Sequence, residues 1–195
     1  MLPILTFDKR KLTPSFGYCF DARWVEPFES IVSVLWKFAR MNSLPGHMVA
    51  TQLCRHPVDP YDGIAPTSAD VDVRGLARLL TVKQKVLRVG LGRSGGPRRM
   101  NPHLRHCSRC MALGYHGVVH QRLGAMQCPV HGDWLEEACR SCGHASVYRL
   151  GAPLLDAPFR CANCRRPYGR SAMGCAGPRP LPAHMRTAIT RACLS

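Results

Sequence analysis

Three features of the chain predict an α-helical domain followed by two small zinc ribbons. Apolar residues recur at helical spacing in residues 27–92, and cysteine and histidine recur in closely spaced pairs in residues 103–174. A glycine-, proline- and arginine-rich stretch at 93–102 separates these two parts. The first pattern is typical of amphipathic helices, the second of tetrahedral zinc sites and the third of a linker. The expected fold class is α plus small zinc ribbons, with an N-terminal helix-turn-helix domain and two tandem ribbon modules.

The 195 residues could form one ordinary core or two to three small modules. The high content of Gly (17) and Pro (16) favours modules, and metal binding can stabilise a half that has few large apolar residues. The expected segments are an irregular N-terminus (1–26), a helical helix-turn-helix-like domain (27–92), a basic linker (93–102), a first zinc ribbon (103–136), a second zinc ribbon (137–174) and a C-terminal tail (175–195). The tail is expected to hold one short helix at 183–193.

The segment 28–42 predicts the clearest helix. Its apolar stripe falls at i, i+3, i+4 and i+7 and consists of Ile31, Val34, Leu35 and Phe38. Asn42 followed by Pro45 marks the end of this helix. A short second helix is expected at 46–54, and the proline-rich residues 55–70 are expected to form a loop.

Residues 71–90 predict two helices with a tight break near Thr81, whose side chain is expected to cap the second helix. This is the layout of a helix-turn-helix. The second helix would carry Lys83, Lys85 and Arg88 on its exposed side, as a DNA-facing helix does. An ordinary helical hairpin with a solvated basic face is the alternative.

The formal net charge of +15 is concentrated in the second part of the chain. Residues 1–70 carry seven basic and seven acidic residues, whereas residues 71–195 carry twenty basic and five acidic ones. This asymmetry predicts a polyanionic partner, nucleic acid before an acidic membrane, with an inert basic surface as the alternative. The candidate nucleic-acid-binding residues are Lys83, Lys85, Arg88, Arg93, Arg98, Arg99 and Arg105.

Residues 1–12 contain no apolar run of signal-peptide length, and no stretch approaches the ~20 apolar residues of a membrane span. We therefore expect a cytoplasmic protein with no membrane partner. Thiols stay reduced in that compartment, so eleven cysteines are read as metal ligands before disulfides.

Four ligand pairs with two-residue spacing carry the metal prediction. They are Cys107-x2-Cys110, Cys128-x2-His131, Cys139-x2-Cys142 and Cys161-x2-Cys164, separated by 17, 7 and 18 residues. Zinc takes four such donors in a tetrahedron, so the chain is expected to bind two Zn²⁺. The near-equal long intervals favour sequential pairing, in which the first two pairs share one ion and the last two share the other. Cross-brace pairing is the alternative. Gly132 and Gly143 follow their ligand pairs directly and suit a turn with positive φ.

The remaining histidines near the cluster are expected to pack or to contact phosphate rather than to bind metal. They are His103, His106, His116, His120 and His144. The remaining cysteines have no partner at metal spacing and are expected to be buried thiols or tail residues. They are Cys19, Cys54, Cys175 and Cys193.

Zinc catalysis is not expected. Zinc deaminases combine H-x-E with a later P-C-x2-C, and the Glu moves protons. Here the acid after His131 is Asp133, and only seven residues separate His131 from Cys139. Four protein ligands at each site would also leave no position for a reacting water. We expect a protein that is not an enzyme.

The segment HCSRCMALGYHGVVHQRLGAMQCPVHGDWLEEACRSCGH (106–144) resembles the zinc-ribbon core of the TniQ/TnsD family of transposon target-selection proteins. Members typically read C-P-x-C-L-x-x-G-Y, H-Q-L, C-P-x-H-x-x-x-L and C-P-x-C-G. The matching residues are Cys107, Cys110, Gly114, Tyr115, His120, Gln121, Cys128, Pro129, His131, Leu135, Cys139, Cys142 and Gly143. FRCANCRRP would close the second ribbon, PFESIVSVLWKFARMN resembles the family's opening helix, and VRGLARLLTVKQKVLRVGL resembles its helix-turn-helix. Ser108 and Arg140 depart from the usual Pro.

The resemblance implies a short, TniQ-like, non-enzymatic adaptor in DNA transposition. It would link target DNA, or a target-recognition complex such as a CRISPR effector, to an AAA+ ATPase regulator and through it to a transposase. A second copy of the chain is a further candidate partner. The alternative function is a zinc-ribbon/helix-turn-helix DNA-binding transcription regulator.

Overall fold

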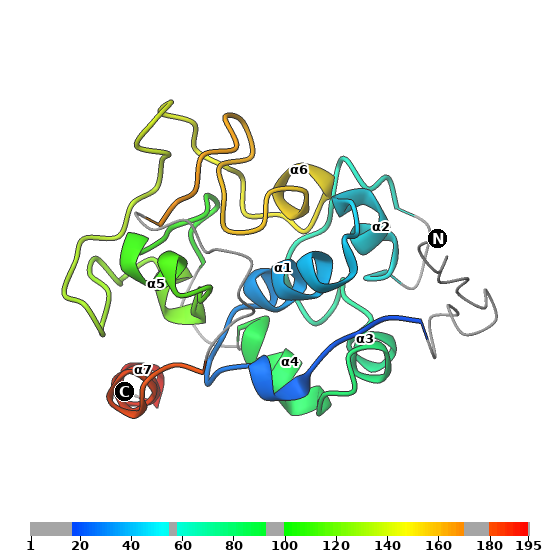
Figure 1. The fold of residues 1–195 in the computed structure, drawn as a ribbon, viewed down its shortest axis with the longest axis horizontal. Helices are drawn as coiled ribbons and strands as arrows, with labels where there is room; N and C mark the ends of the chain where they lie inside the picture. The colour runs from blue at the N-terminus through cyan, green and yellow to red at the C-terminus, as the bar shows by residue number, and fades with distance from the viewer. Residues whose placement is uncertain (1–16, 55–57, 93–99, 170–179, 195) are drawn as a thin grey trace, which may run out of the picture.

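The computed structural model describes residues 17–54, 58–92, 100–169 and 180–194. Its regular elements within these residues are all helical (Figure 1). The α-helices are α1 (Ile31–Asn42), α2 (Gly46–Thr51), α3 (Val73–Leu79), α4 (Gln84–Gly90), α5 (Ser108–Ala112), α6 (Ala152–Leu155) and α7 (Ala183–Leu194). Two 3₁₀ turns, η2 (Ala22–Trp24) and η3 (Val118–Gln121), complete the set. Isolated antiparallel bridges, rather than strands, hold the long loops of the described part together.

Helix α1 runs through the middle of the fold (Figure 1). The side chain of Ser30 caps its first turn by accepting a hydrogen bond from the N–H of Ser33. The expected apolar stripe is buried, but so is the opposite face, including Trp36 and Lys37. The sequence predicted a helix with one covered face, whereas α1 is covered nearly all round.

Burial of Lys37 requires a partner, because an unpaired charge inside a protein is costly. Its ammonium lies 2.6 Å from the carboxylate of Glu29, and both side chains are almost fully buried. The same ammonium donates to the carbonyl of Trp24 (2.7 Å), and Ser33 Oγ donates to Glu29 (2.5 Å). These bonds attach the segment before α1 to the helix itself.

The main core crosses the predicted boundary at 93–102. It joins apolar residues of α1 to α4 with Tyr148, Leu150 and other residues of 137–169. Trp36 Nε1 donates to the carbonyl of Leu154 (2.8 Å), and its ring centroid lies 4.9 Å from that of Phe159. The second cysteine-rich segment therefore shares its core with the helices, while residues 93–99 lie outside the described residues.

Helices α2 and α6 approach closely because Gly46 has no side chain. A Cβ at Gly46 would lie 2.5 Å from the backbone nitrogen of Asp156 and 2.6 Å from the carbonyl oxygen of Ala152. The N–H of Gly46 donates instead to the carboxylate of Asp156. This contact fixes the start of α2 to the end of α6.

Helices α3 and α4 form the expected pair, but Thr81 does not cap the second helix. Thr81 has a φ of 54° and donates its N–H to Arg78, while Val82 donates to Ala77. These two bonds close the end of α3 in a Schellman motif. Lys83 stands at the start of α4 without a side-chain cap. The prediction for Thr81 was wrong because a residue at a helix break can end one helix instead of starting the next.

Helix α7 confirms the short helix expected in the tail, and it packs on the first cysteine-rich segment. Residues Leu181, Met185 and Ile189 form a second, smaller core with residues such as Tyr115 and Val118. Within the described residues, no helix combines the length and hydropathy that crossing a bilayer needs.

Polar contacts hold both ends of α7. Glu26 accepts the N–H of Leu181 (2.8 Å) and pairs with Arg186 (3.0 Å). At the other end, the guanidinium of Arg122 donates to the carbonyls of Ala192 (3.0 Å) and Cys193 (3.2 Å). Positive charge at a helix C-terminus is favourable, so Arg122 both satisfies free carbonyls and complements the helix dipole.

Candidate metal centres

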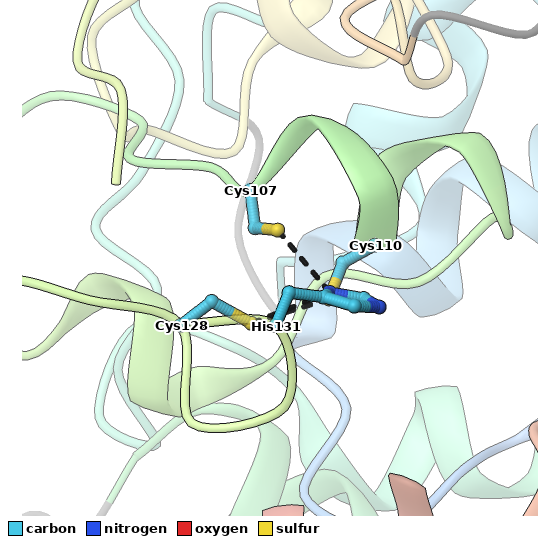
Figure 2. Close-up of side chains that lie close together, drawn as sticks. All are labelled: Cys107, Cys110, Cys128 and His131. Atoms are coloured by element: carbon cyan, nitrogen blue, oxygen red, sulfur yellow. Dashed lines mark hydrogen bonds between the residues drawn. The ribbon is translucent and has the colours of Figure 1, made fainter. Parts of the chain in front are cut away.

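The first cluster brings together Cys107, Cys110, Cys128 and His131 (Figure 2). Nδ1 of His131 lies 3.4 Å from Sγ of Cys107, 3.4 Å from Sγ of Cys110 and 3.6 Å from Sγ of Cys128. The sulfurs of Cys110 and Cys128 are 3.6 Å apart. A zinc tetrahedron with bonds of about 2.3 Å to sulfur and about 2.0 Å to nitrogen has edges of about 3.5–3.8 Å. The four donor atoms therefore match the corners of such a site.

The second cluster brings together Cys139, Cys142, Cys161 and Cys164. The sulfurs of Cys139 and Cys164 are 3.7 Å apart, and those of Cys142 and Cys161 are 3.6 Å apart. A disulfide needs about 2.05 Å, so these are free thiols at the spacing of a four-sulfur metal site.

These two groups confirm the sequential pairing. Within each, all donor atoms lie within 4.8 Å of one another, and each combines neighbouring pairs along the chain. The cross-brace alternative would have joined the first pair to the third, and the arrangement contradicts it. The described residues thus contain two clusters that could each hold a metal ion, compatible with two zinc ribbons.

Three of the four ligand turns share one backbone conformation. The residue after the second ligand has a positive φ and donates its N–H to the carbonyl of the first ligand. This residue is Gly132 (φ 68°), Gly143 (φ 70°) or Arg165 (φ 60°). The two glycines confirm the expectation of a left-handed turn, and Arg165 adopts the same conformation without the freedom of glycine.

The turn from Cys107 to Cys110 differs because it begins helix α5. Tyr115 donates its N–H to the carbonyl of Cys110 (3.1 Å), and Gly114 between them has a φ of 70°. This is a Schellman end, for which glycine is favoured. The hydroxyl of Tyr115 then donates to the carbonyl of Pro27 (3.0 Å). The Gly-Tyr pair thus turns the chain beside the cluster and anchors it to the segment before α1.

His116 connects the first ribbon to α1. Its Nε2 lies 2.7 Å from the carbonyl oxygen of Arg105, which can only accept, so Nε2 carries the proton. Its Nδ1 consequently accepts from the hydroxyl of Ser30 at 2.7 Å. Burial first, and the charge of nearby His120 second, lower the pKa of His116 to about 3, so the ring is neutral.

The other histidines stay out of both clusters, as expected. His106 and His120 are buried, His103 is half-buried and His144 is exposed. Burial lowers the pKa of His120 to about 4. Among the cysteines outside the two clusters, Cys193 is buried and Cys54 half-buried, but Cys19 is exposed, against expectation. Cys175 lies outside the described residues.

Gln121 has a structural role that the spacing of the metal ligands does not predict. Its Oε1 accepts the N–H of Arg105 (3.1 Å), and its Nε2 donates to the carbonyls of Asn101 (2.8 Å) and His103. A fully buried amide with these three bonds fixes the strand-like segment that enters Cys107. Its place directly after His120 in the family-like H-Q pair was the available signal.

The basic residues expected to bind nucleic acid fall into three groups: exposed residues, residues outside the described part of the chain, and the buried Arg105. Lys83, Lys85 and Arg88 are exposed, and the described residues place no acidic side chain in an ion pair with them. Arg93, Arg98 and Arg99 lie outside the described residues.

The prediction for Arg105 was wrong. Its side chain is 3% exposed, lies 3.3 Å from the carboxylate of Glu137 and donates to the carbonyls of Arg122 (3.1 Å) and Ala125. The guanidinium supports the loop that leads to Cys128 and is not available to a phosphate. A count of basic residues could not separate this buried arginine from exposed ones.

No known family model matches the chain, and a comparison with curated proteins finds no match either.

Proposed function

We propose that this chain is a non-enzymatic, TniQ-like adaptor in DNA transposition. It would link target DNA, or a target-recognition complex, to an AAA+ ATPase regulator and so to a transposase. The observation that carries the proposal is that all eight residues of the family-like ligand pattern assemble into two four-donor clusters. The motif residues Gly114 and Tyr115 support this, because they hold the first cluster against the segment before α1.

Zinc is the metal proposed for both clusters. One offers three sulfurs and a nitrogen and the other four sulfurs, and such donors in a tetrahedron suit zinc. Bound zinc would stabilise the fold, because forming the site and ordering its loops are coupled. Four protein donors fill each site, which supports a structural rather than a catalytic role.

The proposed nucleic-acid surface is the exposed side of α3 and α4. Arg74, Arg78, Lys83, Lys85 and Arg88 are all exposed there, and no acidic residue falls between the first and the last. Phosphate contacts of this kind give affinity that falls steeply as salt rises.

The partner proposal is tested by co-purification. The proposal predicts an AAA+ ATPase gene beside that of this chain. The zinc-loaded full chain is co-expressed with that ATPase, and the complex is isolated through a tag on either protein. We expect a complex that needs intact zinc sites and that recruits the transposase only through the ATPase. A neighbourhood without an ATPase and a transposase gene, or a folded, zinc-loaded chain that does not bind the ATPase, would contradict the adaptor.

The DNA surface is tested with matched triple variants. Changing Lys83, Lys85 and Arg88 to Gln removes three charges from α4, and changing Arg109, Arg166 and Arg191 to Gln removes three exposed charges elsewhere. We expect the first variant to bind duplex DNA more weakly, with a salt slope reduced by up to about 0.9 for each lost phosphate contact. An equal loss in the second variant would place the DNA contact elsewhere.

The transcription-regulator alternative predicts a different result in the same assays. A regulator would bind one DNA sequence tightly without any ATPase. The exposed basic side of α4 is the feature that favours it. Tight, sequence-selective binding together with failure to bind the ATPase would favour the regulator over the adaptor.

A further inference from the structure

The two clusters differ in how far solvent reaches their sulfurs. In the first cluster, Cys107, Cys110 and Cys128 are 0%, 0% and 1% exposed. In the second, Cys142 is exposed and Cys164 is half-buried, although Cys139 and Cys161 are buried. The second cluster thus presents a thiol to solvent, and the first does not.

The surroundings of the clusters explain this difference. The first cluster belongs to the small core that α7 covers, with Leu181, Met185 and Ile189 packed beside its cysteines. The ligand turn 140–145 of the second cluster is exposed at every residue. A small dissolved oxidant can therefore reach Sγ of Cys142 directly, whereas it can reach the sulfurs of the first cluster only after α7 or the fold opens.

The donor sets also make the second cluster the more easily oxidised of the two. The fourth donor of the first cluster is the imidazole of His131, which cannot form a disulfide. All four donors of the second cluster are thiols, and the exposed Cys142 has the buried Cys161 at 3.6 Å. A reactive sulfur and a resolving sulfur are therefore already adjacent, as in redox-sensing pairs.

We propose that the second cluster is a peroxide-sensitive site that exchanges its metal for a Cys142–Cys161 disulfide. The Cys142 thiolate attacks one oxygen of hydrogen peroxide, the O–O bond breaks and a sulfenic acid forms. The Cys161 thiolate then attacks that sulfur and displaces the hydroxyl group. Two thiolates lose two electrons, peroxide gains them, and two protons complete two waters. The ion leaves because only Cys139 and Cys164 remain to hold it.

The structural consequence follows from the core. Cys139 and Cys161 lie in the same buried cluster as Phe159, Tyr168 and the residues of α1. Loss of the ion would loosen residues 137–169 from the helices, while the first cluster and α7 would remain folded around their own core. Oxidation would thus act on one half of the protein, and a dithiol reductant with added zinc would restore it. The proposal depends on the proposed zinc occupancy but not on a role in transposition.

The test uses the full chain loaded with two zinc ions and treated with one equivalent of hydrogen peroxide. Zinc release is followed with a colorimetric chelator, and the oxidised sulfurs are mapped by peptide mass spectrometry. We expect release of about one of the two ions, a Cys142–Cys161 disulfide, and reduced Cys107, Cys110 and Cys128. Release of both ions together, first-cluster oxidation before the second, or no release from folded protein would overturn the proposal. A starting content below two ions would contradict the zinc assignment instead.

Two ligand-exchange variants provide matched controls. Cys142→His gives the second cluster the donor set of the first and removes the exposed thiol, so it should keep two ions and resist peroxide. His131→Cys gives the first cluster four thiols, three of them buried and the one at position 131 half-buried. Its ion should therefore still be released after that of the second cluster, whose Cys142 is exposed. Rapid release from Cys142→His, or equal release from both clusters of His131→Cys, would show that exposure of Cys142 does not decide the reactivity. The order of oxidation in the unmodified chain tests the proposal even where a variant does not fold.

Discussion

The hydroxyl of Ser30 donates a 2.7 Å hydrogen bond to Nδ1 of His116, and this pair joins the start of α1 to the first ribbon. The same hydroxyl oxygen accepts the N–H of Ser33 (3.2 Å), and the N–H of Ser30 donates to the carbonyl of His116 (2.8 Å). One serine thus caps the central helix, donates a hydrogen bond to a buried neutral histidine and attaches the ribbon backbone.

Changing Ser30 to Ala should destabilise the whole fold. It removes a helix cap, which costs about 1 kcal/mol, and leaves a buried acceptor on His116 without a partner, which costs about 1–3 kcal/mol. We expect the free energy of unfolding to fall by roughly 2–4 kcal/mol, measured by denaturant titration. Ser43 is exposed at the other end of α1, so Ser43→Ala should change the free energy of unfolding by less than about 0.5 kcal/mol. Equal effects would show that the Ser30–His116 pair contributes little.

His116 should make stability depend on pH. Its pKa is about 3 in the fold and about 6.5 unfolded, so the unfolded chain binds more protons between these values. The stability that comes from keeping the ring neutral is therefore complete above about pH 6.5 and is lost as the pH falls toward 3, by up to about 1.4 kcal/mol per unit.

The measurement compares denaturant titrations at pH 7 and pH 5.5 at a fixed free zinc concentration. His116→Gln can still accept from Ser30 and donate to Arg105 but does not titrate, so it should show a smaller loss at pH 5.5. His184 is exposed on α7, and His184→Gln should behave like the unmodified chain. An unchanged loss in His116→Gln would assign the acid sensitivity to other groups, the metal ligands first.

Gly46 should tolerate no side chain. A Cβ there would overlap backbone atoms of Asp156 and Ala152, which cannot move without shifting α6. We expect Gly46→Ala to lower the free energy of unfolding by about 1–3 kcal/mol, measured by thermal or chemical denaturation. At the exposed Gly124 nothing lies within 4 Å of an added Cβ, so Gly124→Ala should be close to neutral. A neutral Gly46→Ala would mean that α2 and α6 are less closely packed.

Arg122 should hold the end of α7. Changing it to Gln removes charge-assisted bonds to two terminal carbonyls, so amide protons of 183–194 should exchange faster. Arg191 is exposed on α7 itself, and Arg191→Gln removes the same charge without these bonds. Hydrogen-exchange mass spectrometry of both variants makes the comparison. Equal protection of α7 in the two variants would show that apolar packing alone holds it.

The metal ligands could be predicted from sequence because their chemistry is local. Each pair needs only a two-residue spacing and a turn, and Gly132 and Gly143 marked two of those turns. The apolar stripe of α1 could be predicted for the same reason, since helical periodicity is a property of a short segment.

The remaining features depend on contacts between distant segments. Lys37 is charged and its sequence position suggests solvent, yet Glu29 and the Trp24 carbonyl hold it inside. Arg105 lies in a basic stretch, yet Glu137 and two carbonyls from a later loop enclose it. Neither partner can be inferred from spacing along the chain, because each is brought near only by the fold.

The pairing of the two metal sites is tested most directly by counting zinc ions in double variants with native mass spectrometry. Under sequential pairing, Cys110→Ser with Cys128→Ser damages one site, so the chain should retain about one zinc ion, whereas Cys110→Ser with Cys139→Ser damages both and should retain none. The unmodified chain should carry two. The reverse result, with zinc lost entirely from the first double variant and one ion kept by the second, would contradict the account, as would fewer than two ions in the unmodified protein.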